Sequence, residues 1–138
     1  MDIDQKYLDK EMEIMEAVAK ELNLPHVEPT PATHRVDGLL MTGPNGEIKY
    51  MIEAKSRNIE KDKYKTTKLE IGKWIALDRF DRYIPSIIAI GWTDCTGYAK
   101  MQDLKDVKFT LMNRRVIRRP SDWQIAVEIP IDQFTIIT

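Results

Sequence analysis

Apolar positions near the start of the chain recur every three or four residues. Between residues 4 and 22 they alternate with Lys and Glu, the spacing that gathers apolar side chains on one face of a helix. Asn23 and Pro25 follow this segment and predict its end. The pattern therefore predicts an amphipathic helix over residues 4–22, followed by an extended connector over residues 29–32.

The next apolar positions follow the rhythm of strands. Residues 36–41 form a short apolar run that Asp37 interrupts, and residues 48–55 alternate between two faces with a period of two. Between these runs, Thr-Gly-Pro-Asn-Gly at residues 42–46 is a turn signal, because Asn-Gly favours the positive φ angles of a tight hairpin. We expect a β-hairpin here.

The second half of the chain predicts one more helix and several strands. Residues 56–65 are polar and indicate a loop, and Thr66 or Thr67 could cap a buried helix that runs to residue 82. Strands are expected over residues 87–92, 98–101, 107–112 and 125–129, with a turn over residues 93–97. This order of elements predicts one domain over residues 1–138, an α/β sandwich with one mixed sheet.

Composition narrows the class of protein. Of the 138 residues, 43% are hydrophobic and 31% are charged, the balance of a soluble globular protein. The lone Cys95 excludes an internal disulfide framework and a multi-cysteine zinc site. No apolar run approaches the roughly 18 residues of a membrane span, and the first residues lack the order of a signal peptide. We therefore expect a cytoplasmic protein without a membrane partner.

The net charge of −1 hides a segregation of charge along the chain. Residues 1–34 carry eight acids and three bases, residues 55–82 carry nine bases and five acids, and residues 100–119 carry seven bases and two acids. Two basic stretches on one surface would suit a polyanion such as nucleic acid. Ordinary solvated faces explain such runs as well, so charge alone does not decide between the two interpretations.

Two carboxylates and a lysine stand out on the expected hairpin. Glu53 and Lys55 project from the same face of the second strand, and the hairpin would bring Asp37 of the first strand close to them. Two carboxylates suit a hard divalent cation. Such a cation polarises a phosphodiester oxygen and makes water a nucleophile near neutral pH. The alternative is a surface ion pair of Glu53 with Lys55.

These residues resemble a known family. Val36-Asp37, a turn and then Glu53-Ala54-Lys55 is similar to the signature of the PD-(D/E)xK nuclease superfamily, with Val36 in place of the proline. The run from Glu53 to Arg57 is most similar to archaeal Holliday-junction resolvases and small phage nucleases. The resemblance implies a restriction-endonuclease-like αβββαβ core, in which helices flank a central mixed sheet.

The resemblance also implies a ligand set for Mg²⁺, with Mn²⁺ able to substitute. Asp37 and Glu53 would bind the metal directly, the backbone carbonyl of Ala54 would be a further ligand, and Glu16 on the first helix would be an outer or water-mediated ligand. Glu13 lies on a nearby helical face and could take the role of Glu16.

Other carboxylates of the first helix are expected in solvent. Glu11 and Glu21 have the pattern of solvated positions. Glu16 has a simpler alternative as well, an exposed pair with Lys20 one turn later.

Further roles follow from the same resemblance. Lys55 would orient the attacking water, and Lys68, expected on the second helix, would contact the scissile phosphate or that water. The residues expected to bind DNA are Arg57, Lys63, Lys65, Lys68, Arg114 and Arg115. For the two arginines, a basic edge strand that prevents aggregation is the alternative.

The remaining candidates carry weaker expectations. Tyr64 is expected to cover the core, with stacking on a base as the alternative. Trp74 and Trp92 have the spacing of packing residues, and Cys95 is expected to be structural. His34 and its neighbour Arg35 could touch a phosphate.

Together the residues and the resemblance predict a magnesium-dependent DNA endonuclease. The resemblance to resolvases and phage nucleases further implies selectivity for branched DNA, action as a homodimer and a place in a prokaryotic or phage-infected cell. One alternative is a catalytically inactive module of the same fold that binds DNA or a protein. Another is an α/β protein for a small ligand. Metal-dependent cutting separates the first hypothesis from the other two, and DNA affinity separates the last two.

Overall fold

A computed structural model describes the fold over residues 3–31, 34–113 and 123–138. The helices are α1 (Ile3–Glu21) and α2 (Ile71–Asp81). The strands are β1 (His26–Pro29), β2 (Gly38–Met41), β3 (Ile48–Ser56), β4 (Thr66–Glu70), β5 (Ser86–Gly91), β6 (Thr96–Lys100), β7 (Lys108–Asn113), β8 (Trp123–Pro130) and β9 (Thr135–Ile137). Within these residues no helix is long and apolar enough to cross a membrane.

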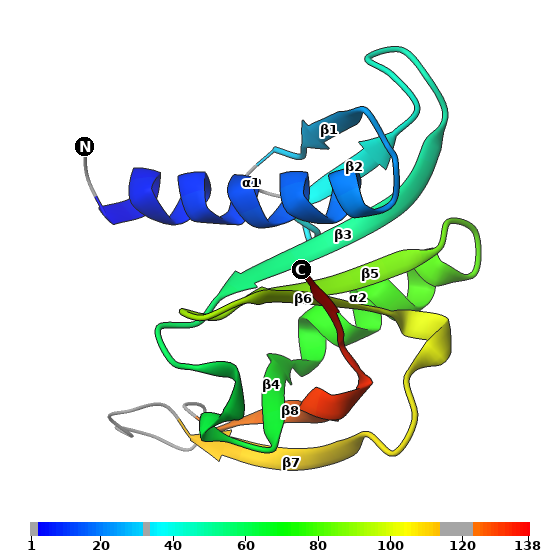
Figure 1. Cartoon of the computed structure of the whole chain (residues 1–138). Helices are drawn as coiled ribbons and strands as arrows, with labels where there is room; N and C mark the ends of the chain where they lie inside the picture. Colours follow the sequence, from blue (N-terminus) through cyan, green and yellow to red (C-terminus); the bar gives the residue numbers. More distant parts are fainter. Residues whose placement is uncertain (1–2, 32–33, 114–122) are drawn as a thin grey trace.

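Six strands form the central sheet in the order β1-β2-β3-β5-β6-β9 (Figure 1). Strands β3 and β5 pair in parallel and every other neighbouring pair is antiparallel, so the sheet is mixed. The expected first helix, the hairpin of β2 and β3, and the apolar strand β5 are all present. The predicted α/β class with a central mixed sheet is confirmed.

The alternation of side chains along β3 and β5 explains why helices pack on both faces of this sheet. Ile52 and Ala54 of β3 pack with Val18 of α1, whereas Met51 packs with Leu77 of α2. All five side chains are buried. Because successive residues of a strand point to opposite faces, Glu53 and Lys55 point to the side of α2.

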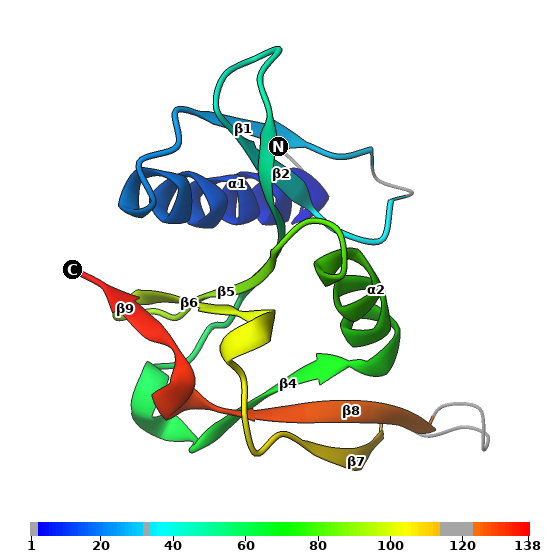
Figure 2. The same ribbon diagram turned by 90° about the vertical axis from the view of Figure 1, so that its right-hand side faces the viewer.

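A second, smaller sheet was not predicted. Strands β4, β8 and β7 form a three-stranded antiparallel sheet that packs beside α2 (Figure 2). Leu69, Val127 and Ile129 of this sheet share one core cluster with Leu77 of α2 and Ile88 of β5. The expectation of one mixed sheet is therefore wrong, because β4, β8 and β7 pair with one another and bury apolar side chains against α2 and the central sheet.

The second helix begins later than expected. Thr66 and Thr67 lie in β4, where Thr67 pairs with Ile129 of β8, and α2 starts at Ile71. Neither threonine caps the helix, because the residue before it is Glu70, in an extended conformation. Threonine is β-branched and favours strands once a partner strand is present. Lys68 therefore lies on a strand and not on the second helix.

The hairpin is confirmed, but its turn differs from the expected type. The N–H of Thr42 donates to the carbonyl of Glu47 at 3.0 Å, and the N–H of Gly46 donates to the carbonyl of Gly43 at 3.0 Å. No glycine in the described part of the chain has a positive φ. The turn is therefore longer than a two-residue Asn-Gly loop, and the register shifts between Leu40 and Met41.

Candidate active site

Asp37 stands directly before β2 and is fixed to the backbone of β3. Its N–H donates to the carbonyl of Ile52 at 3.1 Å, and its Oδ2 accepts a hydrogen bond from the N–H of Ala54 at 2.8 Å. The hairpin therefore holds this carboxylate beside the peptide that joins Glu53 to Ala54. The N–H and C=O of a strand residue point to the same edge, so the carbonyl of Ala54 faces the Asp37 side, beyond the last β2–β3 pair.

Glu53 is the central group of the site. It lies within β3 and is fully buried. The ammonium groups of Lys55 and Lys73 lie 3.3 and 3.5 Å from its Oε1. Neither carboxylate oxygen makes a hydrogen bond of favourable geometry within the described structure. A buried carboxylate without such bonds is costly to stability, and sites of this kind are often functional.

Burial also shifts the titration of Glu53. Loss of solvation raises the pKa of its carboxyl from 4.5 to about 7, and the neighbouring charge of Asp37 acts in the same direction. Lys55 and Lys73 oppose both effects and lower the pKa. A divalent cation at this point would favour the ionised form and replace the missing partners of the carboxylate.

Lys73 is a member of this cluster that the sequence did not single out. It lies in the first turn of α2, and its Nζ also donates to the backbone carbonyl of Arg35 at 2.9 Å. The resemblance implies a lysine on the second helix, and the residue expected to fill that position was Lys68. With the helix starting at Ile71, the lysine of the helix is Lys73.

Lys68 itself pairs with a different carboxylate, Glu128 of β8. It stands on β4 and is exposed, with its Nζ 3.7 Å from Oε1 of Glu128. Its backbone carbonyl accepts a hydrogen bond from the guanidinium of Arg57 at 2.9 Å. The structure therefore brings Asp37, Glu53 and Lys55 together, whereas Lys68 lies on β4 of the smaller sheet.

Glu11 of α1 is a carboxylate on the side of the cluster. It is half-buried, and both this burial and the charge of Asp37 raise its pKa, while Lys55 and Lys73 lower it. Glu11 also lines one hollow together with Asp37 and Lys73, and this shared lining places it beside the site. The expectation that Glu11 is a solvated position is wrong.

The periodicity of α1 carried a signal for Glu11. Positions 11, 15 and 18 follow the helical spacing, and Met15 and Val18 are buried, so Glu11 continues the inward face towards the start of the helix. Glu16 lies five residues on, about 140° around the helix. It is exposed beside a different hollow, which His26 and Lys20 also line. Glu16 therefore does not reach the cluster in this structure.

Three hollows surround the end of β3. One, of about 470 Å³, is lined by Glu11, Asp37 and Lys73. A larger one, of about 760 Å³, is lined by Lys55 and by residues of β4. The third, of about 280 Å³, is polar and lies between α1 and the ends of β3 and β5. Side chains of the charged cluster therefore line two of these hollows, Asp37 and Lys73 the first and Lys55 the larger one.

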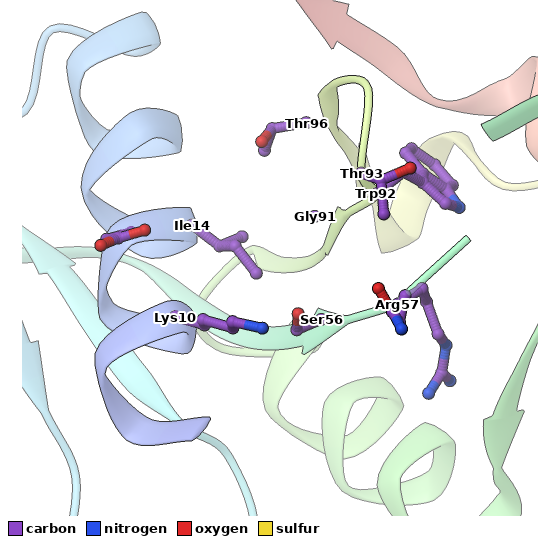
Figure 3. A pocket seen from close by; sticks show the side chains of 10 residues that line it. Lys10, Ile14, Ser56, Arg57, Gly91, Trp92, Thr93 and Thr96 are labelled. Carbon is purple, nitrogen blue, oxygen red and sulfur yellow. The ribbon is translucent and has the colours of Figure 1, made fainter. Parts of the chain in front are cut away.

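Figure 3 shows the polar hollow. Lys10 reaches from α1 towards Ser56 at the end of β3, and the side chains of Thr93 and Thr96 lie on the opposite wall. The side chain of Arg57 runs away from α1, in agreement with its hydrogen bond to the backbone of β4. Glu13 lines the same hollow and is exposed, so this alternative to Glu16 does not join the cluster either. The hollow offers an ammonium and hydroxyl groups to an anion.

The other expected DNA-binding residues are distributed around these hollows. Lys63 and Lys65 are exposed in the segment between β3 and β4, and the Nζ of Lys63 lies 5.8 Å from the ring centre of Tyr64. Tyr64 is 58% exposed, so the expectation that it covers the core is wrong. Arg114 and Arg115 lie outside the described residues.

Several residues have structural roles. Trp92 is buried against Phe134, with ring centres 5.7 Å apart, as expected of a packing residue. Trp74 packs edge-on against Phe109. Burial raises the pKa of the half-buried Cys95 thiol, which suits a structural thiol better than a nucleophile.

His34 and its neighbour Arg35 lie beside the site without a charged contact to it in the described structure. The ring of His34 stacks on Phe80, with ring centres 5.9 Å apart, and its Nδ1 accepts a hydrogen bond from the N–H of Val36. The backbone of Arg35 accepts the hydrogen bond from Lys73. These contacts fix the chain before Asp37 against α2.

The residues fit a hard divalent cation. Asp37 and Glu53 supply two carboxylates, and the oxygens of Glu53 lack hydrogen-bond partners in the described structure. No group of three or more His, Cys, Asp or Glu side chains within residues 3–31, 34–113 and 123–138 could hold a metal by itself. Magnesium keeps several waters and commonly uses only one or two carboxylates. The donor set is therefore suited to Mg²⁺ and poor for a closed zinc site.

Comparison with known proteins gives one match. A family model described as "Phage putative PDDEXK endonuclease" matches residues 4–137. No curated protein and no solved structure matches the chain.

Proposed function

Because the chain belongs to the phage PD-(D/E)xK endonuclease family, we propose that it is a magnesium-dependent deoxyribonuclease. It hydrolyses phosphodiester bonds of DNA at the cluster of Asp37, Glu53 and Lys55. The observation that carries this proposal is the buried carboxylate of Glu53, which lies beside Asp37 and between two ammonium groups without hydrogen bonds of its own in the described structure.

Asp37, Glu53 and the carbonyl of Ala54 would hold the cation, and Glu11 would bind one of its waters. When bound, magnesium supplies charge that polarises the phosphodiester and lowers the pKa of a water. Glu11 takes the role that the resemblance gave to Glu16, because its half-buried side chain lines the same hollow as Asp37, whereas Glu16 lines another. The ligand set thus uses α1, the start of β2 and the end of β3.

The two lysines have separate tasks. Lys55 lies at the solvent-accessible end of β3 and donates a hydrogen bond to the attacking water, which it orients towards the phosphorus. Lys73 approaches the same Glu53 oxygen from α2. Its positive charge lowers the pKa of Glu53 and offsets the negative charge that develops on the phosphate during attack.

The DNA backbone would follow the basic walls of the hollows. Lys10, Arg57 and Lys68 line them, and Lys63 and Lys65 stand nearby. Contacts of this kind position a phosphate backbone without reading sequence. Two symmetric cuts need two such sites, so we propose that the protein acts as a homodimer on branched DNA.

The test is cleavage of four-way junctions and linear duplexes with Mg²⁺ or with EDTA. We expect the wild-type protein to cut junctions only with the metal. Asp37→Ala should abolish cutting, whereas the matched control Asp78→Ala, at an exposed position of α2, should cut normally. Salt-dependent binding without metal-dependent cutting would refute the nuclease and leave a DNA-binding module of the same fold.

A further inference from the structure

The largest of the three hollows differs in character from the other two. This β3–β4 groove has a volume of about 760 Å³ and is lined by Lys55, Arg57, Ile59, Tyr64, Leu69 and Ile131, among others. Its volume lies within the range of about 300–1,000 Å³ that is usual for small-ligand sites. Apolar side chains form much of its surface, which a phosphate backbone alone does not require.

Tyr64 stands at this groove as an exposed aromatic ring. Its side chain is 58% exposed, although Ile59, Leu69 and Ile131 beside the groove are buried or half-buried. The ammonium of Lys63 lies 5.8 Å from its ring centre, so a cation already accompanies the aromatic face. Exposed aromatic rings beside positive charge are the usual platforms on which unpaired bases stack.

The groove is continuous with the proposed site of hydrolysis. Lys55 lines the groove, and its Nζ lies 3.3 Å from Oε1 of Glu53. Lys68 lines it as well, and Arg57 ties its two walls together by donating to the backbone carbonyl of Lys68. A base in the groove therefore belongs to a nucleotide next to the scissile phosphate.

A base within a stacked duplex cannot enter such a groove. It must first leave the stack, which costs least when the base is mismatched or already unpaired. The apolar lining recovers part of this cost by burying the faces of the base. The groove therefore selects DNA that offers an unpaired nucleotide at the site of cutting.

We propose that the β3–β4 groove binds an unpaired nucleobase next to the scissile phosphate, with Tyr64 as its stacking partner. This inference rests on the proposed nuclease function and adds its substrate class. That class is DNA with unpaired nucleotides at bulges, flaps or branch points, in preference to a fully paired duplex.

The test measures binding in EDTA, so that it does not depend on cleavage. Two DNAs of equal length are compared, one fully paired and one with a single bulged 2-aminopurine. We expect the wild-type protein to bind the bulged DNA about 10-fold more tightly, the size of one stacking contact. We also expect quenching of the 2-aminopurine fluorescence, because stacking on an aromatic ring quenches it.

Variants test whether the groove causes the preference for bulged DNA and the fluorescence quenching. Tyr64→Ala should lose both the preference and the quenching, whereas Tyr64→Phe, which keeps the ring, should retain both. Tyr83→Ala removes a tyrosine that is 86% exposed after α2 and should behave as the wild type. A bulge with an abasic nucleotide should bind no better than the paired duplex. Circular dichroism and thermal melting check that every variant is folded.

Two outcomes overturn the proposal. In one, Tyr64→Ala keeps the preference for the bulged base. In the other, it weakens paired and bulged DNA equally, which indicates a backbone contact. Metal-dependent cutting without preference for unpaired bases would refute base binding in the groove but would still support the proposed nuclease function. Tyr64-dependent preference without any cutting would reject the nuclease and retain the groove as a binding site for unpaired bases.

Discussion

Glu53 links the stability of the protein to pH. Its pKa is raised to about 7 by burial and by Asp37, so the folded protein holds this proton more tightly than the unfolded chain does. The stabilisation is complete below the unfolded value of 4.5 and is lost as the pH rises to about 7. The raised pKa corresponds to roughly 3 kcal/mol of the free energy of unfolding.

We therefore expect the wild-type protein in EDTA to lose roughly 3 kcal/mol more than Glu53→Gln between pH 4 and pH 8. Urea unfolding of both proteins across this range measures the difference. The titratable groups that the two proteins share contribute equally to both curves, so their contributions cancel. Glu11 acts in the same direction in both proteins. Parallel stability curves for the two proteins would contradict the raised pKa of Glu53.

Lys73 should matter more for the reaction than Lys68. With Lys73→Met, we expect the rate of cutting to fall about 100-fold, because a charge aimed at the phosphate is lost. The acidic limb of the pH–rate profile should move to higher pH, since Lys73 lowers the pKa of Glu53. Lys68→Met should weaken DNA binding and leave that limb in place. An unshifted limb in Lys73→Met would rule out its coupling to Glu53.

The two carboxylates of α1 can be separated by their effect on metal affinity. Bound Mg²⁺ should raise the melting temperature. In Glu11→Gln, the Mg²⁺ concentration needed for the same rise should be about 10-fold higher, the usual size of an outer-ligand effect. Glu16→Gln should leave this concentration unchanged, because Glu16 is exposed beside another hollow. The reverse order of effects would restore Glu16 as the outer ligand.

The sequence was sufficient for the hairpin residues of the site. Period-two alternation in β3 places Glu53 and Lys55 on one face, and a local turn brings Asp37 to them, so short-range patterns carry that information. Lys73 and Glu11 were missed for a different reason. Their positions depend on where α2 begins and on which face of α1 is buried, and both are decided by packing between distant segments.

At the level of elements, the close approach of β2 to α1 determines where Asp37 lies. A Cβ atom added to Gly38 would lie 2.6 Å from Sδ of Met15 and 3.2 Å from the carbonyl oxygen of Glu28. At Gly43 in the hairpin turn, an added Cβ atom would have no such contact within 4 Å. Glycine at position 38 therefore allows β2 to pack tightly between its neighbours.

Gly38→Ala should destabilise the fold by about 1–3 kcal/mol, the range for overpacking in a core. Gly43→Ala should have little effect. Thermal melting of the two variants measures the contrast, and the displaced strand in Gly38→Ala should also weaken Mg²⁺ binding through the neighbouring Asp37. Equal melting temperatures would show that β2 has room to move.

Strand β4 marks the limit of sequence reading at this scale. Residues 66–70 continue into a helix and have no turn signal before it, so they read as the start of that helix. Their strand conformation comes from β8, which pairs with all five of them. Strand β4 is therefore decided by long-range pairing, whereas β2, β3 and β5 of the central sheet could be predicted from local patterns.

The basic side chains act at the scale of the whole molecule. If Lys10, Arg57, Lys63, Lys65 and Lys68 each meet a phosphate, DNA affinity should fall roughly 500-fold between 50 and 200 mM salt. Binding of Asp37→Ala to junction DNA across this range measures the slope. Lys63→Ala should reduce the slope of log affinity against log salt concentration by about 1, the value for one phosphate contact. Lys49→Ala, at a lysine paired with Glu47 near the hairpin turn and at the opposite end of β3 from Lys55, should not change it.

The two sheets divide the work of the molecule. The carboxylates that we propose as metal ligands and Lys55 belong to the hairpin that enters the central sheet. Strand β4 lines the other side of the β3–β4 groove, where the backbone of Lys68 accepts the hydrogen bond from Arg57. If both proposals hold, substitutions in the small sheet should change which DNA is bound without changing the residues proposed for hydrolysis. Protein engineering could therefore replace residues of β4 while keeping the hairpin of Asp37, Glu53 and Lys55 unchanged.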